Sequence, residues 1–109
     1  MNFANFTIKS QEAIQRAQQI AQSYGHQQIE NEHIVKAMIE VDENVTPFLL
    51  KKLNVNVNLF QQVLDSTLQS FPKVSGADMT LSRDAGNALN EATNIARKMN
   101  DEFVSIEHL

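Results

Sequence analysis

Apolar side chains recur every three or four residues between residues 8 and 24, which is the spacing of one face of an α-helix. They are Ala13, Ile14, Ala17, Ile20, Ala21 and Tyr24. Thr7 stands just before this segment, where a hydroxyl can accept a hydrogen bond from a free N–H of the first turn. Gly25 follows it, at the position where a left-handed residue commonly ends a helix. The pattern predicts a helix over residues 8–24 with both ends marked.

The same spacing predicts four more helices. They lie at about 31–40, at 47–53, from residue 57 to Phe71-Pro72, and from 83 to Met99. Thr46, Asn56 and Ser82 are the expected N-caps, and Pro47 stands at the first helical position after Thr46, where its fixed φ is favourable. Residues 72–80 are expected to form a linker. Since no stretch shows sustained alternation of apolar and polar residues, the predicted fold is all-α.

The chain also repeats itself after 75 positions without a gap. The matching pairs include Ala13 and Ala88, Ala17 and Ala92, Ile20 and Ile95, Thr7 and Ser82, and Glu32-His33 and Glu107-His108. We interpret this as a duplicated helical unit, with one repeat at about 6–80 and part of a second at 81–109. A helical unit needs its partner elements to bury its apolar face. We therefore expect residues 1–109 to be a domain fragment in which the second repeat is truncated.

Composition and charge exclude some kinds of chemistry and make some kinds of partner unexpected. The chain has 109 residues, is 42% hydrophobic, contains no Cys and carries a net charge of -4. Disulfides and thiolate chemistry are excluded, and nucleic acid is an unexpected partner because phosphate neutralisation needs clustered Lys and Arg. No apolar run approaches the length of a bilayer helix, and the N-terminus lacks the pattern of a secretory signal. We expect no membrane partner and a cytoplasmic location.

Few residues suggest catalysis. The sequence has no Walker A motif and no Gly-x-Ser-x-Gly elbow. The pair Glu32-His33 is interpreted as a polar helix start, with the carboxylate near the positive end of the helix dipole, rather than as part of a metal site. Asp101 and Glu107 flank the expected turn after the fifth helix. Without further information Thr7 is a cap, and Leu89 and Ile95 are more often core residues than groove residues.

Both repeats resemble the Clp N-terminal domain, or Clp repeat, of AAA+ chaperones. The matching pattern is a capped helix with alanines four residues apart, followed by an Ile-Glu-x-Glu-His-Ile segment. The first copy of that segment reads Ile29-Glu30-Asn31-Glu32-His33-Ile34, and the second reads Ser105-Ile106-Glu107-His108-Leu109 after Phe103-Val104. Residues 45–50 and 71–76 are most similar to the ClpB disaggregase branch of the family.

This resemblance implies a function that the helical spacing does not. The domain is expected to be non-enzymatic, to need no cofactor, and to catch unfolded or aggregated protein for a homohexameric ATPase ring. ATP and Mg²⁺ would act in the parent's ATPase modules, and a co-chaperone system is a further expected partner. By resemblance, Thr7, Asp101 and Glu107 form a polar substrate-binding cluster, and Leu89 and Ile95 belong to an apolar groove. Two alternatives stay open: an adaptor-docking domain of the ClpC or ClpA type, and a standalone helical interaction protein.

Overall fold

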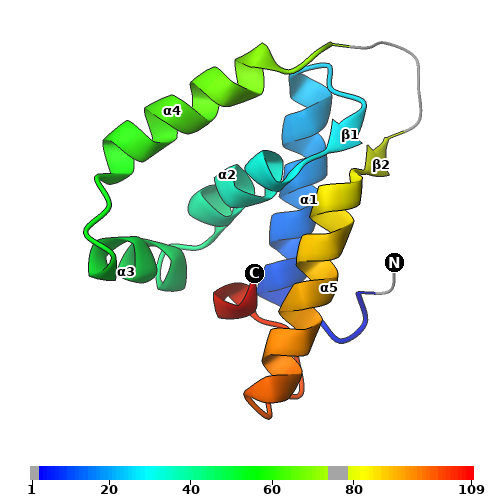
Figure 1. Cartoon of the computed structure of the whole chain (residues 1–109), viewed down its shortest axis with the longest axis vertical. Helices are drawn as coiled ribbons and strands as arrows, with labels where there is room; N and C mark the ends of the chain where they lie inside the picture. Colours follow the sequence, from blue (N-terminus) through cyan, green and yellow to red (C-terminus); the bar gives the residue numbers. More distant parts are fainter. Residues whose placement is uncertain (1–2, 74–78) are drawn as a thin grey trace.

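The computed structural model describes residues 3–73 and 79–109, and within them five α-helices dominate (Figure 1). The elements in chain order are α1 (Ile8–Ser23), β1 (Gln28–Ile29), α2 (Asn31–Val41), α3 (Val45–Lys52), α4 (Val57–Ser70), β2 (Thr80–Leu81), α5 (Arg83–Lys98) and the short 3₁₀-helix η1 (Ile106–His108). The all-α prediction is confirmed, apart from two strands of two residues each. Part of the expected linker, residues 74–78, lies outside the described residues, and Thr80 belongs to β2.

Three of the expected helix caps are present. The side-chain oxygens of Thr7, Asn56 and Ser82 each accept the backbone N–H three residues further on, at 3.2, 3.1 and 3.0 Å. Gly25 has φ +75°, which is the left-handed conformation predicted after the first helix. Because glycine lacks Cβ, it adopts this conformation without the steric cost that other residues meet.

The expected cap of α3 is wrong. The helix begins at Val45 rather than after Thr46, so Pro47 is its third residue. The cap is instead the buried carboxylate of Asp42, whose Oδ2 accepts the Thr46 backbone N–H at 2.7 Å and the Thr46 hydroxyl at 2.8 Å. Its Oδ1 accepts the N–H groups of Asn44 and Val45 at 3.1 and 3.3 Å. One side chain therefore satisfies three backbone donors at the start of α3.

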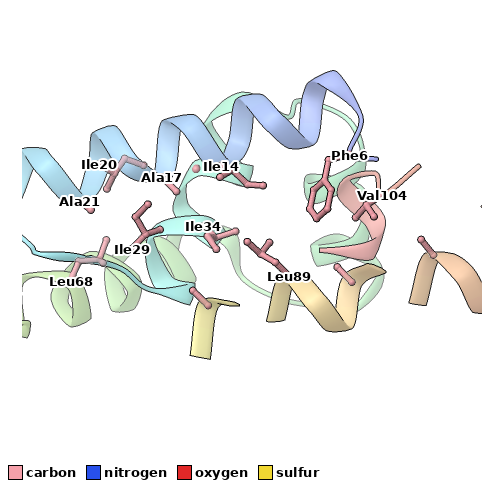
Figure 2. Packing of buried hydrophobic residues seen from close by; sticks show 14 residues of the cluster. Phe6, Ile14, Ala17, Ile20, Ala21, Ile29, Ile34, Leu68, Leu89 and Val104 are labelled. Carbon is pink, nitrogen blue, oxygen red and sulfur yellow. The ribbon is translucent and has the colours of Figure 1, made fainter. Parts of the chain in front are cut away.

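The hydrophobic core lies between α1 and α5. Figure 2 shows Ile29 of β1 and Ile34 of α2 between the side chains of α1 and Leu89 of α5. The buried cluster comprises Phe6, Ile14, Ala17, Ile20, Ala21, Ile29, Ile34, Ala37, Leu68, Ala85, Leu89, Ala92, Ala96 and Val104. The alanines leave room for the larger side chains that enter from α2 and β1, which is why small residues recur on both helices.

Two backbone pairings are related to each other by the same 75-residue shift as the internal duplication. β1 and β2 are parallel, with Ile29 beside Leu81. A second parallel bridge, outside the strands, joins Phe6 to Val104. Phe6 and Leu81 are 75 positions apart, and so are Ile29 and Val104, so each repeat makes the same contact with the other. This reciprocity confirms the duplication that the sequence predicts. The boundary between the repeats at residues 80 and 81 stays a prediction.

Candidate functional site

The three polar residues expected to bind substrate come from two segments that meet at one end of α1. Figure 1 shows η1 beside the first turn of α1. The backbone N–H of Thr7 donates to the carbonyl of Val104 at 2.9 Å, which fixes the loop 101–108 to the start of the helix. The Thr7 hydroxyl donates to Ser10 Oγ at 3.0 Å. Thr7 is therefore a helix cap that also lies next to the loop carrying Asp101 and Glu107.

The loop 101–108 is organised by a buried histidine. His108 Nδ1 accepts the Ser105 backbone N–H at 2.9 Å, so its Nε2 carries the proton that is donated to Asp101 Oδ2 at 2.8 Å. Glu107 accepts the Ser105 hydroxyl at 2.5 Å. These bonds hold both carboxylates on one loop, and the Asp101 side chain remains 45% exposed. The structure brings Thr7, Asp101 and Glu107 to the same end of the molecule, but within the described residues Thr7 does not hydrogen-bond to either carboxylate.

This polar end offers groups that can bind a partner. The carboxylates of Asp101 and Glu107 can accept hydrogen bonds from N–H groups or pair with Lys or Arg of a partner. Among residues 3–73 and 79–109, no group of three His, Cys, Asp or Glu side chains is placed to hold a metal ion.

The two expected apolar groove residues differ in position. Leu89 is only 1% exposed and belongs to the core. It also lines a cavity of about 230 Å³ between α2 and α5, together with Val35, Met38 and Ala88. Ile95 is half-buried on α5 and is not one of the residues lining that cavity. The structure therefore places Leu89, but not Ile95, at an apolar hollow.

A larger cavity adjoins the first along α2. It measures about 470 Å³ and shares Asn31 and Val35 with its neighbour. Its other lining residues are Phe60, Leu64 and Phe71, which are apolar, and Glu30, Glu32 and Asp84, which are acidic. We call the two cavities together the α2 groove. The sequence pattern missed Val35 because it lies off the inward face of α2, next to Ile34.

An ion pair joins α2 and α4, the helices that supply most of the residues lining the larger cavity. Lys36 Nζ of α2 lies 2.6 Å from Asp65 Oδ1 of α4. The hydrogen bond to Asp65 raises the pKa of Lys36, and burial opposes this effect only in part. Because the Asp65 side chain is 44% exposed, the pair contributes little to stability. It links α2 to α4 beside the groove.

Comparison with known proteins identifies the family. The sequence matches the family described as "Clp repeat (R) N-terminal domain" over residues 5–109. The chain belongs to the Clp N-terminal domain family. This Clp repeat is 49% identical over 109 residues to the chaperone protein ClpB of Bacteroides thetaiotaomicron and 38% identical to that of Porphyromonas gingivalis. Each match covers all of this chain and 13% of the relative, so the chain spans about an eighth of the length of these ClpB proteins.

Solved structures agree with the fold. The N-terminal domain of Hsp104 from Candida albicans superposes with a TM-score of 0.84 at 22% identity, covering 95% of this chain and 69% of that one. The N-terminal domain of the ClpV1 ATPase from E. coli gives 0.85 at 19% identity, covering 97% and 65%. These likenesses confirm the Clp repeat fold, and such a domain is not a catalytic module. None of the helices in the described part of the chain is long and apolar enough to cross a membrane.

Proposed function

We propose that this Clp repeat is the substrate-recognition domain of a ClpB-type ATP-dependent disaggregase. It binds exposed segments of unfolded or aggregated proteins and helps to deliver them to the AAA+ ring, a cytoplasmic homohexamer that uses ATP and Mg²⁺ in its own modules. The proposal rests on the α2 groove, a hollow with apolar walls and an acidic edge in a domain that ClpB relatives match along its whole length. These relatives favour the ClpB branch over an adaptor-docking domain of the ClpC or ClpA type.

The size of the groove fits weak capture. Burying apolar surface contributes about 25 cal/mol per Å². The lost freedom of the bound segment offsets much of that contribution. We therefore expect micromolar or weaker affinity for an isolated domain. Weak binding suits a client that must be passed on, and six domains on one ring would raise the effective concentration of binding sites.

The polar end adds hydrogen-bonding groups to this surface. Thr7, Asp101 and Glu107 are proposed to contact polar or basic groups of the client, since Asp101 and Glu107 are exposed on a fixed loop. Leu89 acts through the apolar wall of the α2 groove that it helps to form. Ile95 is proposed as an apolar contact on α5, outside that groove.

A matched pair of substitutions tests the groove. Val35 lines both cavities without belonging to the buried cluster, and Leu59 is an exposed residue of α4, 57% accessible, that lines neither cavity. Val35→Ser should weaken the binding of a permanently unfolded model protein about fivefold, because about 1 kcal/mol of apolar contact is lost. Leu59→Ser should leave the affinity unchanged. The affinities are measured by fluorescence anisotropy. Equal losses in both variants, or nanomolar binding by the single domain, would contradict the proposal.

A further inference from the structure

A buried pair of histidines joins three segments of the first repeat. His33, at the start of α2, is fully buried, and His26, in the loop after α1, is 5% exposed. His33 Nδ1 accepts the backbone N–H of Glu30 at 2.8 Å. Its Nε2 must therefore carry the proton, which is donated to His26 Nδ1 at 2.8 Å. His26 in turn carries its proton on Nε2. The neutral tautomers of both rings are thus set by one backbone N–H.

In the second repeat a carboxylate, instead of an imidazole, is the partner of the buried histidine. Position 101 is 75 residues after His26, and His108 is 75 residues after His33. There Asp101 accepts the Nε2–H of His108 at 2.8 Å, in place of an imidazole. A carboxylate brings a negative charge that balances a charged histidine, whereas a neutral imidazole can accept its hydrogen bond but brings no balancing charge. The two repeats therefore share a geometry, but only the second pairs its buried histidine with an anionic acceptor.

The pair contacts the end of α4. The ring of Phe71, the C-cap of α4, lies 5.5 Å from the ring of His26 and 6.1 Å from that of His33. Tyr24 stacks on His26 at 5.3 Å. His26 Nε2 is buried and has no well-formed hydrogen bond to any described residue. The nearby backbone of Leu68 nevertheless favours the protonated form of His26 and so raises its pKa slightly against the effect of burial. A cavity of about 230 Å³, lined by His26, Glu30, Phe71 and neighbouring residues, gives water a path to the ring.

Few charges act on the pair. Within the described residues these are Glu30, at the start of α2, and Lys73, which follows α4. Glu30 favours a proton on His26, and Lys73 disfavours it. No carboxylate hydrogen-bonds to either ring in the described chain, because the ring nitrogens that have partners bond to each other and to a backbone N–H. If either ring takes up a proton, no hydrogen-bonded carboxylate in the described chain balances its positive charge.

We propose that the His26–His33 pair is an acid-sensitive latch that holds the C-terminal end of α4 against the loop between α1 and α2. A proton on His26 Nδ1 places two donors face to face. A proton on His33 Nδ1 places a donor against the Glu30 N–H. Either event breaks the chain of hydrogen bonds and leaves a buried charge, so Phe71 and the last turn of α4 separate from the loop. Phe71 also lines the α2 groove, so opening the latch changes one wall of that groove.

The direction of the pH effect follows from the neutral state of the closed latch. Burial, and then the charge of His26, lower the pKa of His33 from 6.5 to about 4. Burial, and then Lys73, lower the pKa of His26. The stability of the closed state relative to the open state is therefore fully present above pH 6.5 and decreases as the pH falls toward 4. For one proton, with a pKa of 6.5 in the open state and about 4 in the closed state, the open population rises about 40-fold between pH 6.5 and pH 4.5.

Amide hydrogen exchange tests the latch in the full chain without any substrate. After correction for intrinsic rates, the opening equilibrium of the amides of residues 66–71 should rise about 40-fold between pH 6.5 and pH 4.5. The amides in the middle of α5 report on the second repeat and should change far less. An opening equilibrium at the end of α4 that is the same at pH 6.5 and 4.5 would overturn the proposal.

A double substitution removes the titration and keeps the hydrogen bonds. In His33→Gln the side-chain amide can accept the Glu30 N–H, and in His26→Asn the side-chain oxygen stands where Nδ1 stood. The double variant should lose the acid-induced opening of α4. The matched change His108→Gln in the second repeat should keep it. An unchanged acid response in the double variant would exclude the latch.

Nitrogen-15 spectra of the histidine rings give a test that needs no variant. Both His26 and His33 should be neutral with the proton on Nε2 above pH 6.5. Their charging should occur below pH 6.5 and coincide with the opening of α4. Ordinary titration of both rings near pH 6.5 in the folded chain would overturn the proposal even if the double variant does not fold.

Discussion

The Asp42 side chain shows how one residue organises the start of a helix. Its carboxylate is 4% exposed and accepts hydrogen bonds from three backbone N–H groups and the Thr46 hydroxyl. Burial alone would raise the pKa of Asp42, but the hydrogen bonds from Thr46, Asn44 and Val45 outweigh it and the pKa is lowered. Its contribution to stability is therefore present above its ordinary pKa of 3.8 and is lost as the pH falls below that value.

Replacing this carboxylate should destabilise the protein. In Asp42→Asn one acceptor oxygen becomes an NH₂ group that faces donors, so buried N–H groups are left without partners. We expect a loss of about 2 kcal/mol in the free energy of unfolding at pH 7. The neighbouring exposed Glu43→Gln should change it by less than about 0.5 kcal/mol. Urea unfolding followed by circular dichroism measures both variants. Similar stabilities for the two would show that the Asp42 cap is unimportant.

Local sequence signals predict three of the helix caps correctly and one of them wrongly. The hydroxyls of Thr7 and Ser82 and the amide of Asn56 act as predicted, because a cap of this kind needs only its own side chain and the next three residues. Thr46 before Pro47 carries the same signal, but Asp42 supplies a stronger, charged acceptor four residues earlier and the helix starts sooner. A competition between two nearby caps is decided by geometry that the sequence does not show.

At the scale of elements, helices are predicted well and strands are not. The boundaries of α1 and α5 follow from periodic apolar residues and marked ends, which are properties of the segment itself. β1 and β2 contain two residues each, and they exist only because the two repeats pair across the molecule. The pairing of His26 with His33 was missed for the same reason, since the helical spacing does not show contact between a loop and a helix start.

Two glycines, one in the turn after α1 and one inside α5, should respond to alanine in opposite ways. Gly25 has φ +75°, so Gly25→Ala forces a side chain into a left-handed conformation and should cost about 1 kcal/mol of stability. Its new Cβ would meet Lys73 Cβ at 3.8 Å, which is ordinary contact, so the cost comes from the backbone. Gly86 lies inside α5 with open space around a Cβ, so Gly86→Ala should add about 0.5–1 kcal/mol. Thermal unfolding measures both changes. Shifts of the same sign would contradict this assignment of backbone conformation.

At the scale of the whole molecule, the duplication is predictable and the groove is not. The repeat of 75 positions is visible in the sequence and reappears as reciprocal backbone pairing. The α2 groove is built from α2, α4 and α5, whose lining residues lie far apart in the chain. The assignment of Thr7, Asp101 and Glu107 comes from family resemblance, and the structure adds the loop that places them at one end of α1.

A nuclear magnetic resonance titration of the nitrogen-15-labelled chain with a permanently unfolded protein tests client binding at the α2 groove most directly. We expect fast-exchange shifts at the residues lining the groove, Val35, Phe60 and Leu64 among them, with micromolar or weaker affinity. Smaller shifts should appear at Thr7 and Glu107. Shifts confined to the exposed surface of α3 around Phe48, or none at saturating client, would contradict client binding at the groove.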